Sequence, residues 1–385
     1  MFQKLIGKLN SLKAKMDGMP GWKRGLALLT LVAVLLGTGG VLALAVNAFN
    51  QSNTIVSPVG NSSTKSSKSM VVSPNEPKDT PDPINGVLYA KSEVNNWKTR
   101  VPLAIMIENH VDARPQSGLS KAEVVYEALA EGGITRFMAI FLASSTEVGP
   151  VRSARAYYLD WLSEYGAGYA HWGGSPEAMD LIKRYSLKDL DQFFLGAPTY
   201  WRVADRAAPH NGYSSTDKLW EAAEKRGYNV LPSFDSWKFK NDSTDSAKTA
   251  GTINIDFGSA DAYNVTWKYD PEKNIYLREN GKVAYKDKVN DEQFSAKNIV
   301  VESVKASSYD SYGRLSMETV GSGDAKIFRD GTVVEGTWKK PSREERTKFY
   351  DQAGQEIELN RGQIWIEVIP SSAGGLKGAK IEYSS

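Results

Sequence analysis

Two arginines in the segment GPVRSAR have the spacing to bind an anion. Arg152 and Arg155 are three residues apart in the first turn of a predicted helix, so both can face a ligand that also meets unpaired backbone N–H groups. Arg136, in the segment GGITRF, is a third candidate. Guanidinium groups bind phosphate or carboxylate bidentately, so the pattern favours an anion site. Internal pairing with acids such as Asp160 is the structural alternative.

Polar residues also follow the first predicted strand, which ends at Glu108. The end of this strand and the loop after it supply Glu108, Asn109, His110, Asp112 and Arg114. The carboxyl ends of strands in open α/β sheets commonly hold ligands. The alternative is an ordinary polar loop.

A glycine turn in the segment YAHWGGSPE leads into another predicted helix, with Ser175 at its N-cap and Pro176 at its first position. The backbone at Gly174 and Ser175 can cradle an anion at such a turn. His171 lies beside the turn, although core packing is the alternative for this residue.

A further polar loop, residues 202–215 (RVADRAAPHNGYSS), contains Arg202, Asp205, Arg206, His210 and Asn211. The three histidines of the chain all fall within these polar segments, which favours an acid–base or metal-binding role. No paired His-x-x-x-His spacing supports a metal site, so metal ligands stay undetermined and a divalent cation such as magnesium is one open alternative.

The elements that position these residues predict an α/β domain over residues 86–245, with a mixed or parallel sheet and flanking helices. Strands are expected at 101–108, 137–142 and 169–172. A helix is expected after Ser120, which forms a capping box with Glu123, and another from Arg152 to Gly166.

Residues 246–385 predict a mainly β domain, because apolar residues there alternate with a period of two. Examples are the segments 252–257, 265–269 and 363–369. One helical turn is expected at Ser342, and hairpin turns are expected at Gly281, Gly331 and Gly354.

The N-terminal residues predict a membrane anchor. The uncharged run that begins at Gly25 is long enough for a transmembrane helix over residues 25–48. Residues 1–24 are basic and amphipathic, which places the N-terminus in the cytoplasm and the domains outside it, and residues 49–85 predict a disordered linker. A cleaved signal peptide is the alternative. The net charge of +2 gives no indication of nucleic-acid binding, and the absence of cysteine excludes disulfides and thiol nucleophiles.

The segments VPLAIMIENHVDARPQSGLSKAEVVYEALAEGGITRFMAIF, EVGPVRSARAYYLDWLSEYGAGYAHWGGSPEA and RAAPHNGYSS resemble the YerB-like family of bacterial lipoproteins. The resemblance is strong over residues 99–230, and residues 300–370 are similar to the second domain of that family. Family members often carry a lipid-modified cysteine, and this chain has none, so its predicted helix would supply the anchor.

A weaker resemblance is to the LytR-CpsA-Psr family of membrane-anchored phosphotransferases, which use arginines and a divalent cation on polyprenyl-pyrophosphate-linked glycopolymers. Glu108, Arg136, Arg152 and Tyr169 stand in the order of comparable groups in that family. The acid expected after the loop arginine is Ser153 here, which departs from the pattern.

The leading hypothesis is therefore a membrane-anchored, extracytoplasmic envelope protein that binds an anionic ligand. The expected ligand is phosphorylated, and a polyprenyl-linked ligand is one alternative. The expected ligand-binding residues are Asn109, Arg136, Arg152, Arg155, His171, Gly174, Ser175, Arg206 and Asn211. If there is turnover, resembling a cell-wall phosphotransferase, the candidate catalytic residues are Glu108, Asp205 and His210. The rival hypothesis is a non-catalytic scaffold that binds an envelope protein.

Overall fold

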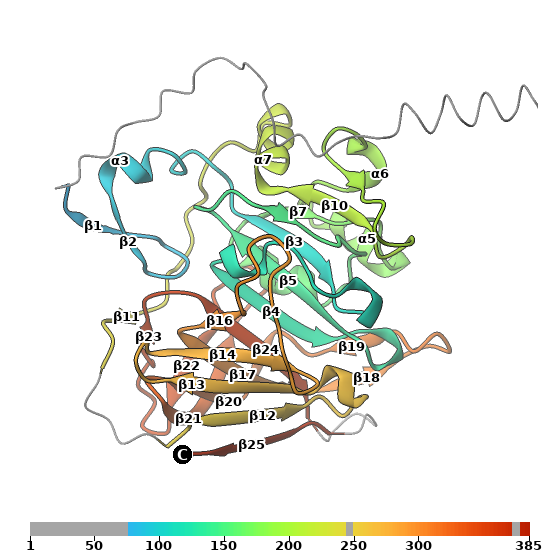
Figure 1. Ribbon diagram of the computed structural model, residues 1–385. Coiled ribbons are helices and arrows are strands. Elements are labelled where there is room, and N and C mark those ends of the chain that lie inside the picture. The colour runs from blue at the N-terminus through green and yellow to red at the C-terminus, as the bar shows by residue number, and fades with distance from the viewer. Residues whose placement is uncertain (1–75, 244–248, 372–377) are drawn as a thin grey trace, which may run out of the picture. The chain divides into compact units, whose positions relative to one another are not determined.

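The computed structural model describes residues 76–243, 249–371 and 378–385. These described residues form one compact unit that is rich in strands and has short helices (Figure 1). The expected segments 1–24 and 25–48 lie outside the described residues. Among the helices of the described ranges, none combines the length and the apolar character needed to cross a bilayer.

Ten strands form one mixed sheet, here called the long sheet. Their order is β22 (Lys348–Asp351), β21 (Thr332–Lys340), β20 (Gly321–Arg329), β17 (Asn298–Val304), β24 (Ile364–Pro370), β4 (Val124–Leu129), β5 (Thr135–Phe141), β3 (Leu103–Glu108), β7 (Gly168–Ala170) and β8 (Lys188–Asp189). The strand β24 pairs in parallel with β17 on one side and with β4 on the other. Strands from both sides of the predicted domain boundary at residue 245 therefore share one hydrogen-bonded sheet.

A second sheet packs against one face of the long sheet. It contains β15 (Val283–Ala284), β14 (Ile275–Asn280), β13 (Val265–Asp270), β12 (Thr252–Asp256) and β25 (Lys380–Ser384), with β16 (Ser295–Ala296) also paired to β14. The ring of Trp267 on β13 contacts Trp365 on β24 with their centroids 5.2 Å apart. The Trp267 indole N–H also donates to the Glu367 carboxylate at 2.9 Å. These contacts join the two sheets through apolar rings and one buried acceptor.

Short strands complete the β structure. They are β1 (Lys78–Pro81) with β2 (Leu88–Ala90), β6 (Glu147–Val148) with β10 (Gly212–Ser215) and β9 (Trp201–Arg202), β11 (Phe239–Lys240) with β23 (Leu359–Asn360), and β18 (Ala306–Ser308) with β19 (Leu315–Met317). The β6–β10–β9 group brings the loop after β9 toward the end of β3, which matters for the site below.

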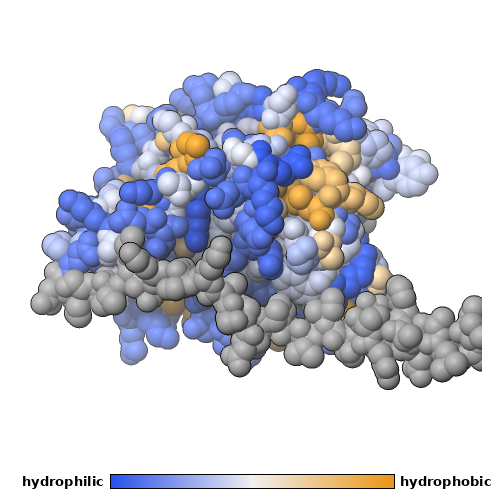
Figure 2. Space-filling view, turned by 90° about the horizontal axis from the view of Figure 1, so that it is seen from above, coloured by the Kyte–Doolittle hydropathy of each residue, from blue (hydrophilic) through white to orange (hydrophobic). Residues whose placement is uncertain are grey.

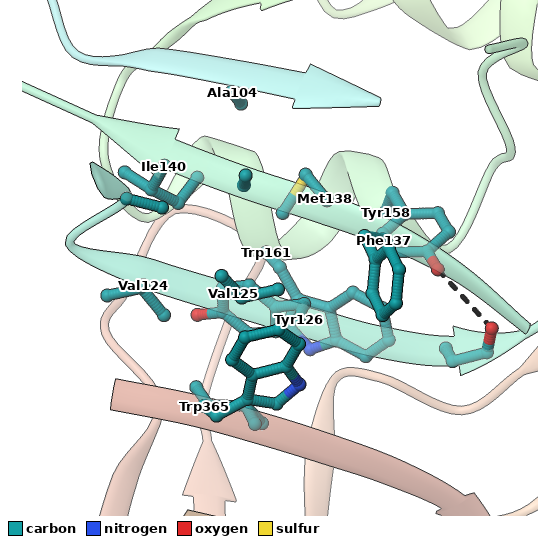
Figure 3. Close-up of a cluster of buried hydrophobic side chains, with 14 of the residues drawn as sticks. Ala104, Val124, Val125, Tyr126, Phe137, Met138, Ile140, Tyr158, Trp161 and Trp365 are labelled. Atoms are coloured by element: carbon teal, nitrogen blue, oxygen red, sulfur yellow. Dashed lines mark hydrogen bonds between the residues drawn. The ribbon is translucent and has the colours of Figure 1, made fainter. Parts of the chain in front are cut away.

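The described helices are α3 (Lys91–Val94), α4 (Tyr158–Ser163), α5 (Pro176–Arg184), α6 (Gln192–Leu195) and α7 (Thr216–Lys225). The helix α4 packs on the long sheet through Trp161, whose ring stacks on Tyr126 of β4 with centroids 5.4 Å apart. Figure 3 shows these two rings in the core together with Phe137, Tyr158 and Trp365. Since Tyr126 contacts α4 and its neighbour Glu127 contacts the second sheet, both faces of β4 are covered.

The six predicted strands are confirmed as β3, β5, β7, β12, β13 and β24. The predicted mixed sheet is confirmed as well, because β3 pairs in parallel with β7 and antiparallel with β5. Ser175 caps α5 as expected, since its side chain accepts the Ala178 N–H at 3.2 Å. The hairpin turn at Gly331 also forms, with φ values of 53° at Asp330 and 69° at Gly331, typical of a two-residue turn. Gly281 and Gly354 likewise adopt positive φ in turns.

The predicted helix after Ser120 is wrong, because Val124–Leu129 is the buried strand β4. All of its residues are buried, so the apolar positions carry no period that separates a strand from a helix. The supposed capping residue Glu123 instead accepts the backbone N–H groups of Leu142 at 2.9 Å and Ala143 at 3.0 Å. Its carboxylate therefore fixes the end of β5 and caps no helix.

Two further helix predictions are wrong in position or existence. The helix expected at Arg152 begins only at Tyr158, because residues 150–154 run as extended chain beside β3 and residue 174. Near Ser342 the chain bends without a helical turn. There the buried Lys340 ammonium donates hydrogen bonds to the backbone carbonyls of Arg343 and Glu345. In a helical turn these carbonyls would instead accept backbone N–H groups.

The predicted disordered linker is too long at its C-terminal end. Residues 78–81 form β1, and Ile84 is fully buried. The Asp82 carboxylate accepts the Ile84 N–H at 2.7 Å, which holds a tight turn before β2. A buried side chain and local acceptors thus order a segment whose composition is typical of a linker.

Candidate functional site

Five polar side chains meet at the carboxyl end of β3. They are here called the Glu108 cluster and comprise Glu108, His110, Asp112, Arg152 and His210. Glu108 is the last residue of β3 and is 4% exposed, whereas the Asp112 side chain is 68% exposed. The cluster therefore extends from a buried carboxylate to solvent.

Backbone pairing explains why residues distant in sequence converge there. The Glu108 N–H donates to the Pro150 carbonyl at 2.9 Å, and the Arg152 N–H donates to the Met106 carbonyl at 2.9 Å. On the other side of this segment, the Val151 N–H donates to the Gly212 carbonyl at 2.7 Å. The segment around residue 151 thus lies between the end of β3 and the start of β10, which places Arg152 and His210 beside Glu108.

Glu108 uses one carboxylate oxygen for each of two neighbours. Its Oε1 lies 3.1 Å from Arg152 Nε, and its Oε2 lies 3.1 Å from His210 Nδ1. These contacts have ion-pair distances but poor hydrogen-bond alignment, and Oε2, Nε and Nδ1 are all buried.

The outer part of the cluster consists of two histidines and an aspartate. The rings of His110 and His210 stack with centroids 4.7 Å apart. Asp112 Oδ2 lies 3.5 Å from His110 Nδ1 and 4.0 Å from His210 Nε2. His110 also accepts the Asp112 backbone N–H at 3.2 Å, so its Nδ1 carries a lone pair in this arrangement.

Arg155 and Arg136, both expected to bind ligand, have internal partners. Arg155 forms a bidentate salt bridge with Glu131, in which Nε lies 2.5 Å from Oε1 and Nη2 lies 2.7 Å from Oε2. Burial acts to raise the pKa of Glu131, but the Arg155 hydrogen bonds and charge outweigh it and lower that pKa. Arg136 is 7% exposed and donates to the Ser153 carbonyl at 2.8 Å, and burial lowers its pKa. Their observed contacts match the structural alternative, with Glu131 as the acid.

Arg206 and Asn211 hold the loop that carries His210. Arg206 donates to the carbonyls of Ala113 and Pro115, each at 2.6 Å, and so ties this loop to the one after β3. The Asn211 amide donates to the carbonyls of Val203 and Arg206, each at 3.1 Å. Both side chains position the Glu108 cluster through the backbone.

The residues of the glycine turn are also occupied. His171 is fully buried, with Nε2 at 3.0 Å from Asp189 and Nδ1 at 2.8 Å from the Gly173 carbonyl. Gly174 forms a parallel bridge with Ala154, and Ser175 caps α5. The turn therefore braces the segment that follows Arg152.

Asn109 and Asp205 lie in other networks. Asn109 is fully buried and donates to Glu127 at 3.1 Å and Thr135 at 2.7 Å. Asp205 is exposed and pairs with Lys288 at 2.6 Å, and this hydrogen bond is the main cause of its lowered pKa. Of the expected catalytic residues, Glu108 and His210 come together, and Asp205 pairs elsewhere.

His110 and Asp112 were recognised in the sequence only as part of a polar loop. The signal that would have selected them is their spacing from Glu108, because the strand-terminal acid is followed by His-x-Asp where the chain enters a turn. That turn is the short 3₁₀ helix Val111–Ala113, whose first residue follows His110.

Comparison with known proteins identifies relatives of both halves of the chain. The "Protein of unknown function (DUF3048) N-terminal domain" matches residues 89–229, and the corresponding C-terminal domain matches residues 253–366. A Bacillus subtilis (strain 168) protein named "Putative lipoprotein YerB" is 32% identical over 273 residues, covering 70% of this chain and 82% of the relative. The crystal structure of YerB protein from Bacillus subtilis is similar with a TM-score of 0.70 and 29% identity, covering 79% of this chain and 100% of that chain.

Proposed function

The chain belongs to the DUF3048 family, and on that premise we propose that it is a membrane-anchored envelope protein that binds an anionic ligand through Arg152. The relative from Bacillus subtilis carries the name "Putative lipoprotein YerB", which supports attachment to a membrane. The present sequence contains no cysteine for a lipid, so the proposed anchor is segment 25–48, with the described domains outside the cytoplasm.

The observation that carries ligand binding is the state of the Arg152 side chain. Its Nε faces the buried Glu108, while its terminal nitrogens donate no hydrogen bond to any described residue. The side chain is 27% exposed, so a ligand can reach it. A phosphate or carboxylate group suits these two free donors, because guanidinium binds such groups bidentately.

The buried Glu108 also affects how strongly an anion binds at Arg152. Its carboxylate already contacts the Arg152 guanidinium, so part of the positive charge of that guanidinium is compensated before an anion arrives. If turnover occurs, Glu108 and His210 are the pair placed to move a proton, because their polar atoms are 3.1 Å apart.

Replacing Arg152 by glutamine is expected to weaken binding of an anionic probe by about 10- to 100-fold, which is the value of a charge-assisted hydrogen bond. The probes are inorganic pyrophosphate and polyprenyl phosphate, titrated calorimetrically into the full-length protein in detergent. Arg155→Gln is the matched control and should change the affinity less than twofold, because Glu131 already occupies its donors. Equal weakening in both variants, or no binding by the native protein, contradicts the proposal.

Extracytoplasmic placement predicts a separate result. Protease added to intact cells that lack an outer barrier is expected to remove the folded region, while an internal cytoplasmic control protein stays intact. The cleavage should fall before residue 78, since residues 78–81 already form the strand β1. Complete protection of the folded region contradicts this placement.

A second candidate function is protein binding at an apolar surface. Figure 2 shows hydrophobic side chains gathered in patches on an otherwise largely hydrophilic face. Among the most exposed apolar residues are Phe193 and Phe194 of α6, at 75% and 49% exposure. Exposed apolar patches commonly mark interaction surfaces, so this candidate gains weight if the anionic probes fail to bind.

A further inference from the structure

Three side chains of the Glu108 cluster present metal-ligating atoms to one another. His110, Asp112 and His210 each offer one donor atom, and these atoms all lie within 4.8 Å of one another. They come from two loops that are far apart in sequence, and Arg206 ties these loops together by its hydrogen bonds to the first of them. The juxtaposition therefore belongs to the fold and does not result from one flexible segment.

We propose that His110, Asp112 and His210 bind a divalent transition-metal ion of the zinc class, with Glu108 as the residue that orients His210. Two imidazole nitrogens and one carboxylate oxygen suit zinc and neighbouring first-row ions better than magnesium, which prefers oxygen donors. Three protein ligands leave at least one coordination position for water or a ligand atom. This inference goes beyond the proposed function and does not depend on anion binding.

The second observation that points to a metal is the buried carboxylate behind His210. Glu108 Oε2 is buried, has no aligned hydrogen bond, and lies 3.1 Å from His210 Nδ1. When that nitrogen carries the proton, the opposite nitrogen, Nε2, has its lone pair free for a metal. A histidine ligand that donates its other N–H to a carboxylate is the usual arrangement around protein-bound zinc.

The distances are compatible with coordination after a small closure. Donor atoms bound to one zinc ion lie about 2.0 to 2.2 Å from it, which places them roughly 3 to 4 Å apart. Asp112 Oδ2 is 3.5 Å from His110 Nδ1 and 4.0 Å from His210 Nε2. The exposed Asp112 and the 30% exposed His110 can rotate, which releases the His110 Nδ1 lone pair from the Asp112 N–H, whereas His210 is held at Glu108. We therefore expect the stacked rings to separate as the ion binds.

The open coordination position would adjoin Arg152, because Arg152 and His210 contact the same carboxylate. A ligand carrying an anionic group could then contact the ion and the guanidinium together. The proposal thus names a cation site next to the anion site, and Glu108 contacts one residue of each.

The test is titration of Co²⁺, followed by Zn²⁺, into the full-length protein in detergent and phosphate-free buffer. One ion per chain is expected, with the visible absorption of a Co²⁺ site of low coordination number. Asp112→Asn and His110→Ala should weaken binding by about 10-fold or more, and Glu108→Gln by about 10- to 100-fold. Asp205→Asn is the matched control, because Asp205 is an exposed acid that pairs with Lys288 and should leave binding unchanged.

The outcomes separate this inference from the proposed function. Arg152→Gln should retain the Co²⁺ site while it loses the anionic probe, whereas Asp112→Asn should lose the metal. Because the Asp112 side chain is exposed, Asp112→Asn should fold normally. A thermal melt of the metal-free variant checks this. Absence of a one-to-one site in the native protein, or equal binding by the Asp112 and Asp205 variants, overturns the inference.

Discussion

Replacing Arg278 by methionine is expected to lower the free energy of unfolding by about 3 to 5 kcal/mol, because the buried acids Glu127 and Glu367 lose the cation that they share. Arg278 on β14 is fully buried, and it pairs with Glu127 of β4 and with Glu367 of β24, the latter at 2.7 Å. Its guanidinium also lies 4.6 Å from the centre of the Trp365 ring. Urea denaturation at neutral pH measures the loss.

The control for this prediction is Lys268→Met on the neighbouring strand. Lys268 pairs with Glu279 at 2.6 Å, but its side chain is 54% exposed, so the expected loss is at most about 1 kcal/mol. Adding Glu127→Gln and Glu367→Gln to Arg278→Met should restore part of the stability, because the uncompensated charges are then removed. A loss no larger than that of the Lys268 variant contradicts the assigned role.

Replacing Glu302 by glutamine is expected to stabilise the protein at pH 8 and to have little effect at pH 4.5. Glu302 on β17 is 1% exposed, and burial raises the pKa of its carboxyl to about 8, with the charge of Glu164 adding to the effect. The Glu302 carboxyl group therefore binds its proton more tightly in the folded chain than in the unfolded chain. The contribution of this group to stability is present below its ordinary pKa of 4.5 and is lost as the pH rises through about 8.

The size of this effect follows from about 1.4 kcal/mol for each unit of pKa shift, which gives up to about 4 kcal/mol at pH 8. The measurement is the difference in unfolding free energy between Glu302→Gln and the native protein across that pH range. Glu318→Gln serves as the control, because Glu318 forms an exposed pair with Lys305 and should change stability by less than about 0.5 kcal/mol at either pH. A difference that does not grow with pH contradicts a neutral buried Glu302.

Local patterns predicted those elements whose residues carry a clear local signal. The apolar run of β3 and the alternation in β12 and β13 gave the correct strands, and Ser175 with Pro176 marked the true start of α5. The pattern failed at β4, since full burial removes the period on which the distinction rests. The second sheet, which covers the other face of β4, comes from residues far along the chain. The local sequence pattern around β4 could therefore not reveal that this face is buried.

The candidate site was predictable in part for the same reason. The strand-terminal position of Glu108 indicated a ligand site, and Arg152 and His210 were singled out for their chemistry. The contact among the three depends on the extended segment around residue 151, which the sequence suggested to be a helix. That error also paired Arg155 with Arg152, although Arg155 is held by Glu131. Arg278 was not selected, because an arginine within an alternating strand usually faces water.

The central position of β24 has a consequence for how the protein is made. A ribosome completes residues 124–129 long before residues 364–370, so a growing or exported chain has β4 without its neighbour on that side. Until residues 364–370 arrive, the hydrogen-bonding edge of an apolar strand is open to wrong partners. Export as an unfolded chain, followed by folding after release, would spare the cell that hazard, and a protein truncated before residue 364 should be a target for quality control.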